Sequence, residues 1–145
     1  MKVLIQKVLN ASVTVNNQKV SEIGKGFLLF IGVEKNDGAA QADYLAKKVS
    51  NLRIFEDENN KMNLSIKDVG GEILAVSQFT LAADLSRGNR PGFETAAHPH
   101  EAKPVYEYFV AQLQACGFSV KTGIFQADMK VALINDGPCT FVLQK

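Results

Sequence analysis

Two nearly uninterrupted apolar runs, at residues 26–33 and 72–79, constrain the fold more than any other feature of the chain. The first contains Phe27-Leu28-Leu29-Phe30-Ile31 without a polar residue. A run of this length is too short for a typical helix. Because polar residues do not alternate within it, it predicts a strand that is buried on both faces. We therefore expect both runs to form buried strands.

Further strands are expected around these two runs. Residues 3–8 and 12–15 are predicted strands, the second because polar and apolar residues alternate along it. Asn16-Asn17 then supplies a turn into a hairpin partner at 19–23. Other patterns predict strands at 62–66, 120–125, 131–135 and 140–143.

Two stretches show the apolar spacing of helices. The first follows Asn36 or Asp37, either of which is a suitable N-cap, and its stripe consists of Ala42, Leu45, Ala46, Val49 and Leu52. The second is expected over residues 101–116, with Pro104 in its first turn and Gly117 after its end. The apolar face of this second helix is expected to consist of Ala102, Val105, Phe109, Leu113 and Cys116.

Together these elements predict an α+β fold. We expect a single domain over residues 1–145, in which a mixed or mostly antiparallel sheet of barrel-like character packs against two main helices. Residues 81–100 form the longest irregular stretch, and a loop of this length in a compact domain is usually functional or mobile.

The charge balance limits the class of partner. The formal net charge is +1, which argues against binding nucleic acid through bulk electrostatics but leaves room for a local grip on a few phosphates. The densest basic cluster is Arg87-Gly88-Asn89-Arg90. No window approaches the ~20 apolar residues that span a bilayer, and no export signal is visible. With only two distant cysteines, we expect a cytoplasmic protein without membrane contact.

Several residues that often carry chemistry have a simpler structural explanation. Cys139 has no sequence-near histidine, and Cys116 falls on the helix stripe as a core residue would. His98 and His100 lack a third metal ligand, and residues 56–58 lack the ligand pattern of a calcium loop. We expect no metal and no cofactor. The chemistry must then depend on backbone donors, on geometry or on the substrate itself.

Ser77-Gln78-Phe79-Thr80, at the end of the second apolar run, is one candidate site. If the strand continues, Gln78 and Thr80 share one face and offer an amide and a hydroxyl to the same substrate atom. Backbone N–H groups at a strand end are also free to stabilise an oxyanion. A strand that simply ends in polar residues explains the pattern equally well.

Gly137-Pro138 is the second candidate. Proline has a fixed φ and no N–H, so it does not fit inside a central ladder. The residues alone favour an ordinary turn between two hairpin strands. The alternative is a cis peptide bond, whose two carbonyl oxygens would point in nearly the same direction and reject one hand of a chiral substrate.

The chain closely resembles the D-aminoacyl-tRNA deacylase family, also called D-tyrosyl-tRNA deacylase, nearly from end to end. Its two signatures are Ser-Gln-Phe-Thr and Gly-Pro, in this order. The other similar segments are Ala11-Ser12-Val13-Thr14-Val15, Gly32-Val33-Glu34, Asn51-Leu52-Arg53-Ile54-Phe55, Met62-Asn63-Leu64-Ser65, Ala127-Asp128-Met129-Lys130-Val131 and Asn135-Asp136.

The resemblance implies a homodimer with its active site at the subunit interface. In such proteins Gly137-Pro138 would be cis and would enter the site of the partner subunit. There it would exclude L-aminoacyl groups rather than grasp the D side chain. Achiral glycine would pass the same filter, so that glycyl-tRNA would be a second substrate beside D-aminoacyl-tRNA.

The implied reaction is hydrolysis of the ester between the amino acid and the terminal ribose. Thr80 is the family's candidate nucleophile. Alternatively, the ribose 2′-hydroxyl assists the attack while Gln78 and the Phe79 N–H hold the carbonyl, with Ser77 beside them. Phe125 and Met129 would contact the terminal adenosine.

The chain departs from the family pattern at three positions. An aromatic residue is expected at Ala82, a serine at Gly92 and a valine at Cys139. The first two border the irregular loop and bear on the pocket rim. The Cys139 change is nearly isosteric. A binding module that recognises an RNA 3′ end or a free D-amino acid without catalysis is the competing hypothesis.

Overall fold

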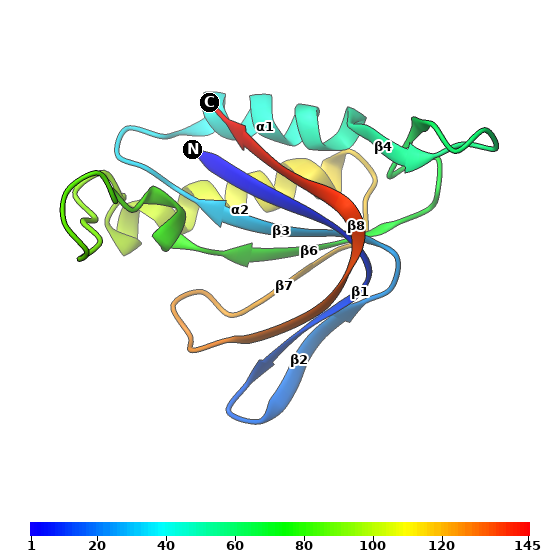
Figure 1. The fold of residues 1–145 in the computed structure, drawn as a ribbon. Helices are drawn as coiled ribbons and strands as arrows, with labels where there is room; N and C mark the ends of the chain where they lie inside the picture. The colour runs from blue at the N-terminus through cyan, green and yellow to red at the C-terminus, as the bar shows by residue number, and fades with distance from the viewer.

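The computed structural model describes residues 1–145 and is built around one curled, six-stranded sheet (Figure 1). The elements in chain order are β1 (Lys2–Val15), β2 (Gln18–Ile23), β3 (Gly26–Gly32), α1 (Ala39–Asn51), β4 (Arg53–Glu56), β5 (Met62–Ser65), β6 (Glu72–Ser77), the 3₁₀ turn η1 (Phe79–Ala82), α2 (Pro99–Ala115), β7 (Val120–Thr122) and β8 (Lys130–Gln144). The strand order is β2-β1-β3-β6-β7, and β8 pairs with β1. The strands β4 and β5 form a separate ribbon.

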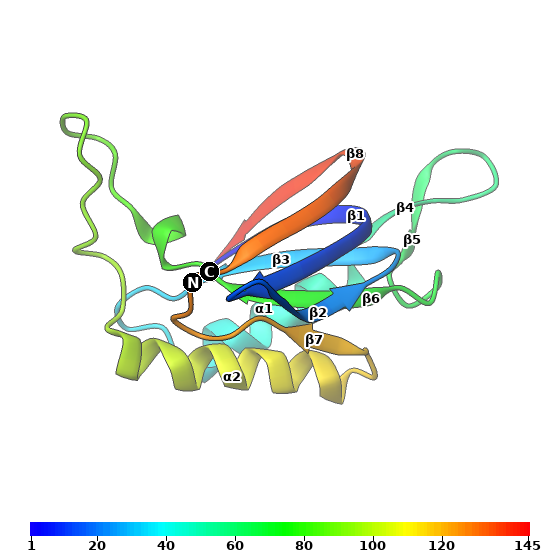
Figure 2. The same cartoon turned by 90° about the horizontal axis from the view of Figure 1, so that it is seen from below.

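The sheet is mixed. The strands β1, β2, β3 and β8 pair in antiparallel fashion, whereas β3 pairs in parallel with β6 and β6 with β7. Both helices lie on the same side of the sheet and pack against each other, and the far end of the sheet curls over (Figure 2). The predicted α+β class, with a mixed, barrel-like sheet and two main helices, is confirmed.

The central strands are buried on both faces, as the apolar runs predict. On β3, Phe27, Leu29 and Ile31 belong to the large core between sheet and helices. Leu28 points the other way, into a smaller cluster in the hollow of the curled sheet. Alternate residues therefore serve two cores, and each position along the strand must be apolar.

Two pairs of predicted strands are single long strands. Residues 3–8 and 12–15 both belong to β1, and residues 131–135 and 140–143 both belong to β8. The prediction of a turn at Gly137-Pro138 is therefore wrong. The register places Gln6 opposite Thr140 and Val8 opposite Asn135, so that four residues of β8 lie opposite one residue of β1. We call residues 136–139 the β8 bulge. A bulge accommodates proline because its residues need no ladder hydrogen bond.

Smaller predictions about helix ends are also wrong. Helix α1 begins after Gly38, not at Asn36 or Asp37, because the Asp37 carboxylate accepts bonds from the Glu34 N–H and the Met1 amino group. Helix α2 begins at Pro99, so Pro104 lies in its second turn. Cys116 is exposed at the end of α2 and is not a core residue. Strand β4 was not predicted, since a four-residue strand carries little periodicity.

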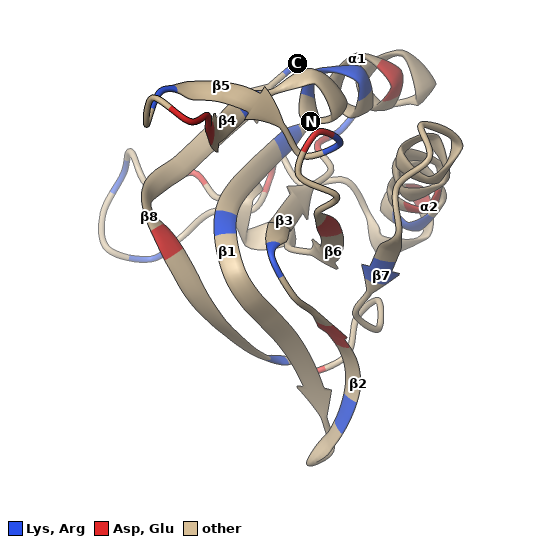
Figure 3. Cartoon of the chain, turned by 90° about the vertical axis from the view of Figure 1, so that its right-hand side faces the viewer, with Lys and Arg blue, Asp and Glu red and all other residues tan.

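Charged residues are interspersed over the elements, and Lys and Arg do not gather on one strand or helix (Figure 3). This agrees with the net charge of +1. None of the helices is both long enough and apolar enough to cross a membrane.

Candidate active site

A pocket of about 510 Å³ opens where the carboxyl end of β6 meets the start of α2 and the connection between β7 and β8. Ten of its 14 lining residues are hydrophobic. The set comprises Ile31, Val33, Val76, Ser77, Gln78, Phe79, Ala97, Pro99, Ala102, Phe125, Gln126, Ala127, Met129 and Val131. Five predicted site residues thus line one hollow, although they come from segments almost 50 positions apart.

Phe125 and Met129 form one wall of the pocket. The Phe125 ring is tilted against Tyr106 at a centroid distance of 5.8 Å. The buried Tyr106 hydroxyl donates to the Ala75 carbonyl at 3.0 Å, and burial raises the pKa of this tyrosine to about 12. Met129 lies directly over Gly123, where a Cβ would collide with its sulfur. Tyr106 therefore supports the wall from behind, and Met129 occupies the space that a side chain at position 123 would take.

Gln78 and Thr80 form the polar end of the site. Strand β6 ends at Ser77, and the chain enters η1 instead of continuing to Phe79 as predicted. Gln78 and Thr80 still come together, since Gln78 Nε2 donates to Thr80 Oγ1 at 2.5 Å. Thr80 is exposed and does not line the pocket. Of this pair, only Gln78 lines the hollow.

The turn leaves two backbone donors free. The Gln78 N–H donates to the Ile31 carbonyl at 2.7 Å, next to the last parallel pair, Ile31 with Ser77. The next two N–H groups, of Phe79 and Thr80, have no hydrogen-bond partner. Adjacent unpartnered N–H groups at a turn are suited to hold an oxygen that carries negative charge.

No titratable side chain lines the pocket. A neighbouring polar hollow of about 460 Å³ shares Ala97 with it and contains Glu34, Asp37, His98 and Glu101 among its lining residues. His98 and His100 stack at 5.8 Å on the exposed start of α2, and no group of three or more metal-binding side chains is close enough to hold an ion. The pocket can thus orient and polarise a ligand but holds no acid or base.

The β8 bulge lies elsewhere. The Gly137–Pro138 peptide bond is cis, and both residues are exposed. Below them Lys7 is 3% exposed, and its Nζ lies 3.2 Å from Asp136 Oδ2. Burial lowers the pKa of Lys7, but the hydrogen bond to Asp136, together with the charges of Cys139, Asp136 and Glu56, outweighs burial, so that the pKa lies above its usual value. Buried Cys139 anchors the other side of the bulge, near the Ile54 carbonyl.

The bulge does not reach the pocket of its own chain. Ser77 pairs with Ile31 near one end of β3, whereas Lys7 pairs with Phe27 near the other end. Four strand residues correspond to about 13 Å. Neither Gly137 nor Pro138 lines the pocket.

Sequence reasoning missed the contribution of the loop and helix start. Ala97, Pro99 and Ala102 line the pocket from the amino end of α2, and Gln126 and Ala127 line it from the connection before β8. Small residues and a glutamine carry no chemical signal in a sequence. Only the proline at the start of a helix could have marked this corner.

Fold and site together define a single-domain α+β protein whose apolar pocket ends in a glutamine amide and two unpartnered backbone N–H groups. A family model described as D-Tyr-tRNA(Tyr) deacylase matches residues 4–144. This chain belongs to that family.

Relatives of high identity extend over the whole chain. The D-aminoacyl-tRNA deacylase of Pelobacter propionicus is 54% identical over 145 residues, with 100% of both chains covered. The protein of the same name from Pseudoalteromonas translucida is 57% identical over 143 residues, with 99% of each chain covered. The resemblance to this family is confirmed.

Two solved structures share the fold. The c-Myc DNA Unwinding Element Binding Protein has a TM-score of 0.94 at 38% identity and covers 100% of this chain and 99% of its own. A probable eukaryotic D-amino acid tRNA deacylase has a TM-score of 0.82 at 15% identity, with 98% of this chain and 97% of that chain covered. The second likeness concerns the fold alone.

Proposed function

We propose that this protein hydrolyses the ester bond of D-aminoacyl-tRNA, and of glycyl-tRNA, to give free tRNA and the D-amino acid or glycine. Membership of the family supports the substrate class. The observation that carries the reaction is the polar end of the pocket, where the Gln78 amide and free N–H groups stand beside apolar walls without an acid or base. An aminoacyl ester is already activated, so that positioning and oxyanion stabilisation supply most of the required catalysis.

The terminal adenosine is proposed to occupy the apolar part of the pocket. Phe125 and Met129 offer flat or polarisable surfaces to the base, and stacking of a base on an aromatic side chain contributes about 1–3 kcal/mol. Such contacts read a base by its face, which suits the 3′ end common to all tRNAs. Ser77 lies at the junction between this part and η1.

The reacting carbonyl is proposed to lie against η1. The Phe79 N–H and the Gln78 amide donate to its oxygen, which gains negative charge as water attacks the acyl carbon. The ester C–O bond then breaks, the OH of water stays on the amino acid, and its proton passes to the ribose oxygen that leaves. Since the pocket has no titratable side chain, we assign the help in this proton transfer to the neighbouring ribose 2′-hydroxyl.

Thr80 as a nucleophile is the alternative mechanism. Its hydroxyl accepts a bond from Gln78 and has no base beside it to remove its proton. The position supports a role in orienting the Gln78 amide. A Thr80→Ala enzyme separates the two mechanisms, as described below.

We propose that the functional unit is a homodimer in which the β8 bulge of one subunit closes the pocket of the other. Support comes from the bulge itself, which is exposed, firmly anchored by Lys7 and Cys139, and remote from its own pocket. Gly137 and Pro138 would crowd the space that an L side chain needs. Glycine and D-residues would pass, and the enzyme would act in the cytoplasm, where aminoacyl-tRNA is used.

The direct test is incubation with D-Tyr-tRNA and L-Tyr-tRNA, with release of the amino acid as the readout. We expect hydrolysis of the D ester and survival of the L ester. Equal hydrolysis of both would overturn the chiral filter. Saturable binding of D-Tyr-tRNA without release would instead favour a binding module for RNA 3′ ends.

A further inference from the structure

The 3₁₀ turn η1, which carries the proposed carbonyl-binding groups, is held only weakly by its own hydrogen bonds. The N–H groups of Leu81 and Ala83 donate to the Gln78 and Thr80 carbonyls at 3.2 and 3.1 Å. A turn of this kind has poor hydrogen-bond geometry and leaves its last carbonyls without partners inside the element. The position of η1 therefore depends on groups from other parts of the chain.

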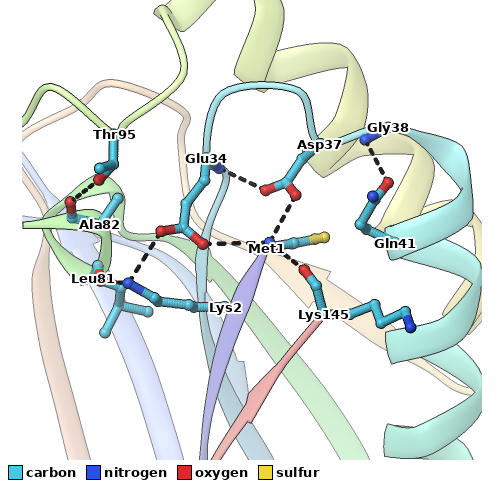
Figure 4. Close-up of polar contacts among 10 residues, drawn as sticks. All are labelled: Met1, Lys2, Glu34, Asp37, Gly38, Gln41, Leu81, Ala82, Thr95 and Lys145. Carbon is cyan, nitrogen blue, oxygen red and sulfur yellow. Dashed lines mark hydrogen bonds and ion pairs between the residues drawn. The ribbon is translucent and has the colours of Figure 1, made fainter.

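Two distant side chains supply those partners (Figure 4). Lys2 Nζ, at the start of β1, donates to the Leu81 carbonyl at 3.2 Å. Thr95 Oγ1, in the loop before α2, donates to the Ala82 carbonyl at 2.6 Å. A hydrogen bond from an ammonium is roughly twice as strong as a neutral one, which makes the bond from Lys2 the firmer of the two by charge.

Glu34 fixes the Lys2 ammonium. Lys2 Nζ lies 3.1 Å from Glu34 Oε1, while Glu34 Oε2 lies 3.5 Å from the Met1 amino group. The Glu34 N–H donates to Asp37 Oδ2 at 2.6 Å, which holds the carboxylate's own backbone in place (Figure 4). The Lys2 and Glu34 side chains are only 24% and 19% exposed, so that salt screens their attraction less than on an open surface.

Strand β3 restricts the position of η1 on the side where the two elements are in contact. Gly32 lies opposite Lys2 in the ladder between β1 and β3. A Cβ on Gly32 would lie 2.9 Å from the Leu81 Cβ and 3.1 Å from the Gln78 carbonyl oxygen. The turn thus has no room to move toward β3, and the bond from Lys2 keeps it from moving away.

We propose that Lys2 is a positioning residue for ester hydrolysis. Its ammonium fixes η1 against Gly32 and thereby sets where the Gln78 amide and the Phe79 N–H point. This inference rests on the proposed function. Since these groups act on the reacting carbonyl and the adenosine binds to other walls, loss of the Lys2 bond lowers kcat and leaves KM nearly unchanged.

The experiment compares Lys2→Met, which keeps a long unbranched side chain without the donor, with Lys2→Arg, which keeps a cation. Steady-state hydrolysis of D-Tyr-tRNA gives kcat and KM. We expect Lys2→Met to lower kcat about 10-fold and to change KM less than about 2-fold, and Lys2→Arg to recover most of kcat. Lys19→Met is the matched control, because Lys19 forms an exposed pair with Glu22 far from η1.

Outcomes that contradict the inference are distinct from a failure of the proposed function. If the wild-type protein does not hydrolyse D-Tyr-tRNA, the proposed function fails. If the wild type is active and Lys2→Met keeps its kcat, or loses it no more than Lys19→Met, the role of Lys2 is wrong. Should Lys2→Met not fold, Glu34→Gln decides, because it releases the Lys2 ammonium from its anchor: an unchanged kcat overturns the inference, and a decrease of about 3-fold with an unchanged KM supports it.

Discussion

The η1 turn and the β8 bulge both interrupt regular strand structure, but they face different surroundings. The turn faces a pocket of about 510 Å³ and leaves two N–H groups without partners. The bulge projects into solvent above a buried lysine that is paired with Asp136. The η1 region offers hydrogen-bond donors beside a pocket, whereas the bulge offers exposed residues that buried Lys7 and Cys139 support. In the proposed homodimer, the two regions would come together in one site.

Among the substitutions that compare η1 with the β8 bulge, we expect the largest effect on activity at Gln78. Gln78→Ala removes the proposed donor to the carbonyl oxygen and is expected to lower kcat about 100-fold, as the loss of one oxyanion donor does elsewhere. Gln18→Ala, in exposed β2, is the control. A decrease of less than about 3-fold would mean that the Gln78 amide does not act on the carbonyl.

A substitution in the bulge tests the other half of the comparison. Within its own chain, a Cβ on Gly137 would lie 3.4 Å from Asn135 Nδ2, so Gly137→Ala is expected to fold normally. In the proposed dimer the same methyl group would crowd the substrate in the pocket of the partner subunit, and we expect kcat/KM for D-Tyr-tRNA to fall about 30-fold. Gly38→Ala, which meets no neighbouring atom, is the control. Unchanged hydrolysis of the D ester would remove the bulge from the site.

A substitution at Phe125 tests whether substrate binding and the chemical step depend on different parts of the proposed site. Phe125→Leu keeps an apolar side chain but removes the ring that is proposed to stack on adenine. We expect KM to rise about 10-fold with little change in kcat, in line with the usual contribution of one stacked base. Competition by a short RNA that ends in adenosine provides an independent readout. A fall in kcat at constant KM would place Phe125 at the carbonyl instead.

The ion pair between Lys7 and Asp136, which anchors the β8 bulge, is expected to contribute to the free energy of unfolding. Asp136→Asn leaves the buried Lys7 ammonium without its counter-ion and is expected to cost about 1–2 kcal/mol, measured by thermal unfolding. Because the folded-state pKa of Lys7 is raised, its contribution is present in full below its ordinary value of 10.5 and is lost as the pH rises through the raised value. The difference between wild type and variant should therefore be constant from pH 7 to 9 and shrink above pH 10.5. Glu22→Gln, in an exposed pair, should cost less than about 0.5 kcal/mol.

The smallest effect is expected at Thr80. Its hydroxyl accepts a hydrogen bond from Gln78 but does not line the pocket, so Thr80→Ala should keep kcat within about 3-fold of the wild type. A hydroxylamine trap for an acyl-enzyme checks the same point. Loss of activity by several orders of magnitude, or a trapped acyl-Thr80, would restore the nucleophile mechanism.

The same two regions show how far the sequence could predict the structure. The apolar runs predicted β3 and β6 because both faces of these strands are buried and the local pattern reports that directly. The turn at Gly137-Pro138 was predicted wrongly because local rules read proline as the end of a strand. The decisive factor is long-range pairing of β8 along β1, in which four residues of β8 lie opposite one residue of β1 as a bulge. No local pattern encodes such a register.

Within the site, the polar residues Gln78 and Thr80 could be predicted from the sequence better than the apolar residues that line the pocket. Gln78 and Thr80 were expected together because of a shared strand face, and they meet instead through the turn of η1. Phe125 and Met129 were placed by resemblance to the family. The small residues at the start of α2 could not be predicted as pocket residues, because this part of the pocket requires only small side chains and no particular chemical group.

The central claim, that each site combines η1 of one subunit with the β8 bulge of the other, is tested most directly by mixing two inactive variants. Subunits of Gln78→Ala and Gly137→Ala are denatured together, refolded at equal amounts and assayed on D-Tyr-tRNA. If the site spans two subunits, half of the dimers are mixed and one of their two sites is intact, so that about a quarter of wild-type activity returns. If both parts of a site came from one chain, every site would carry one substitution and the mixture would stay as inactive as its components.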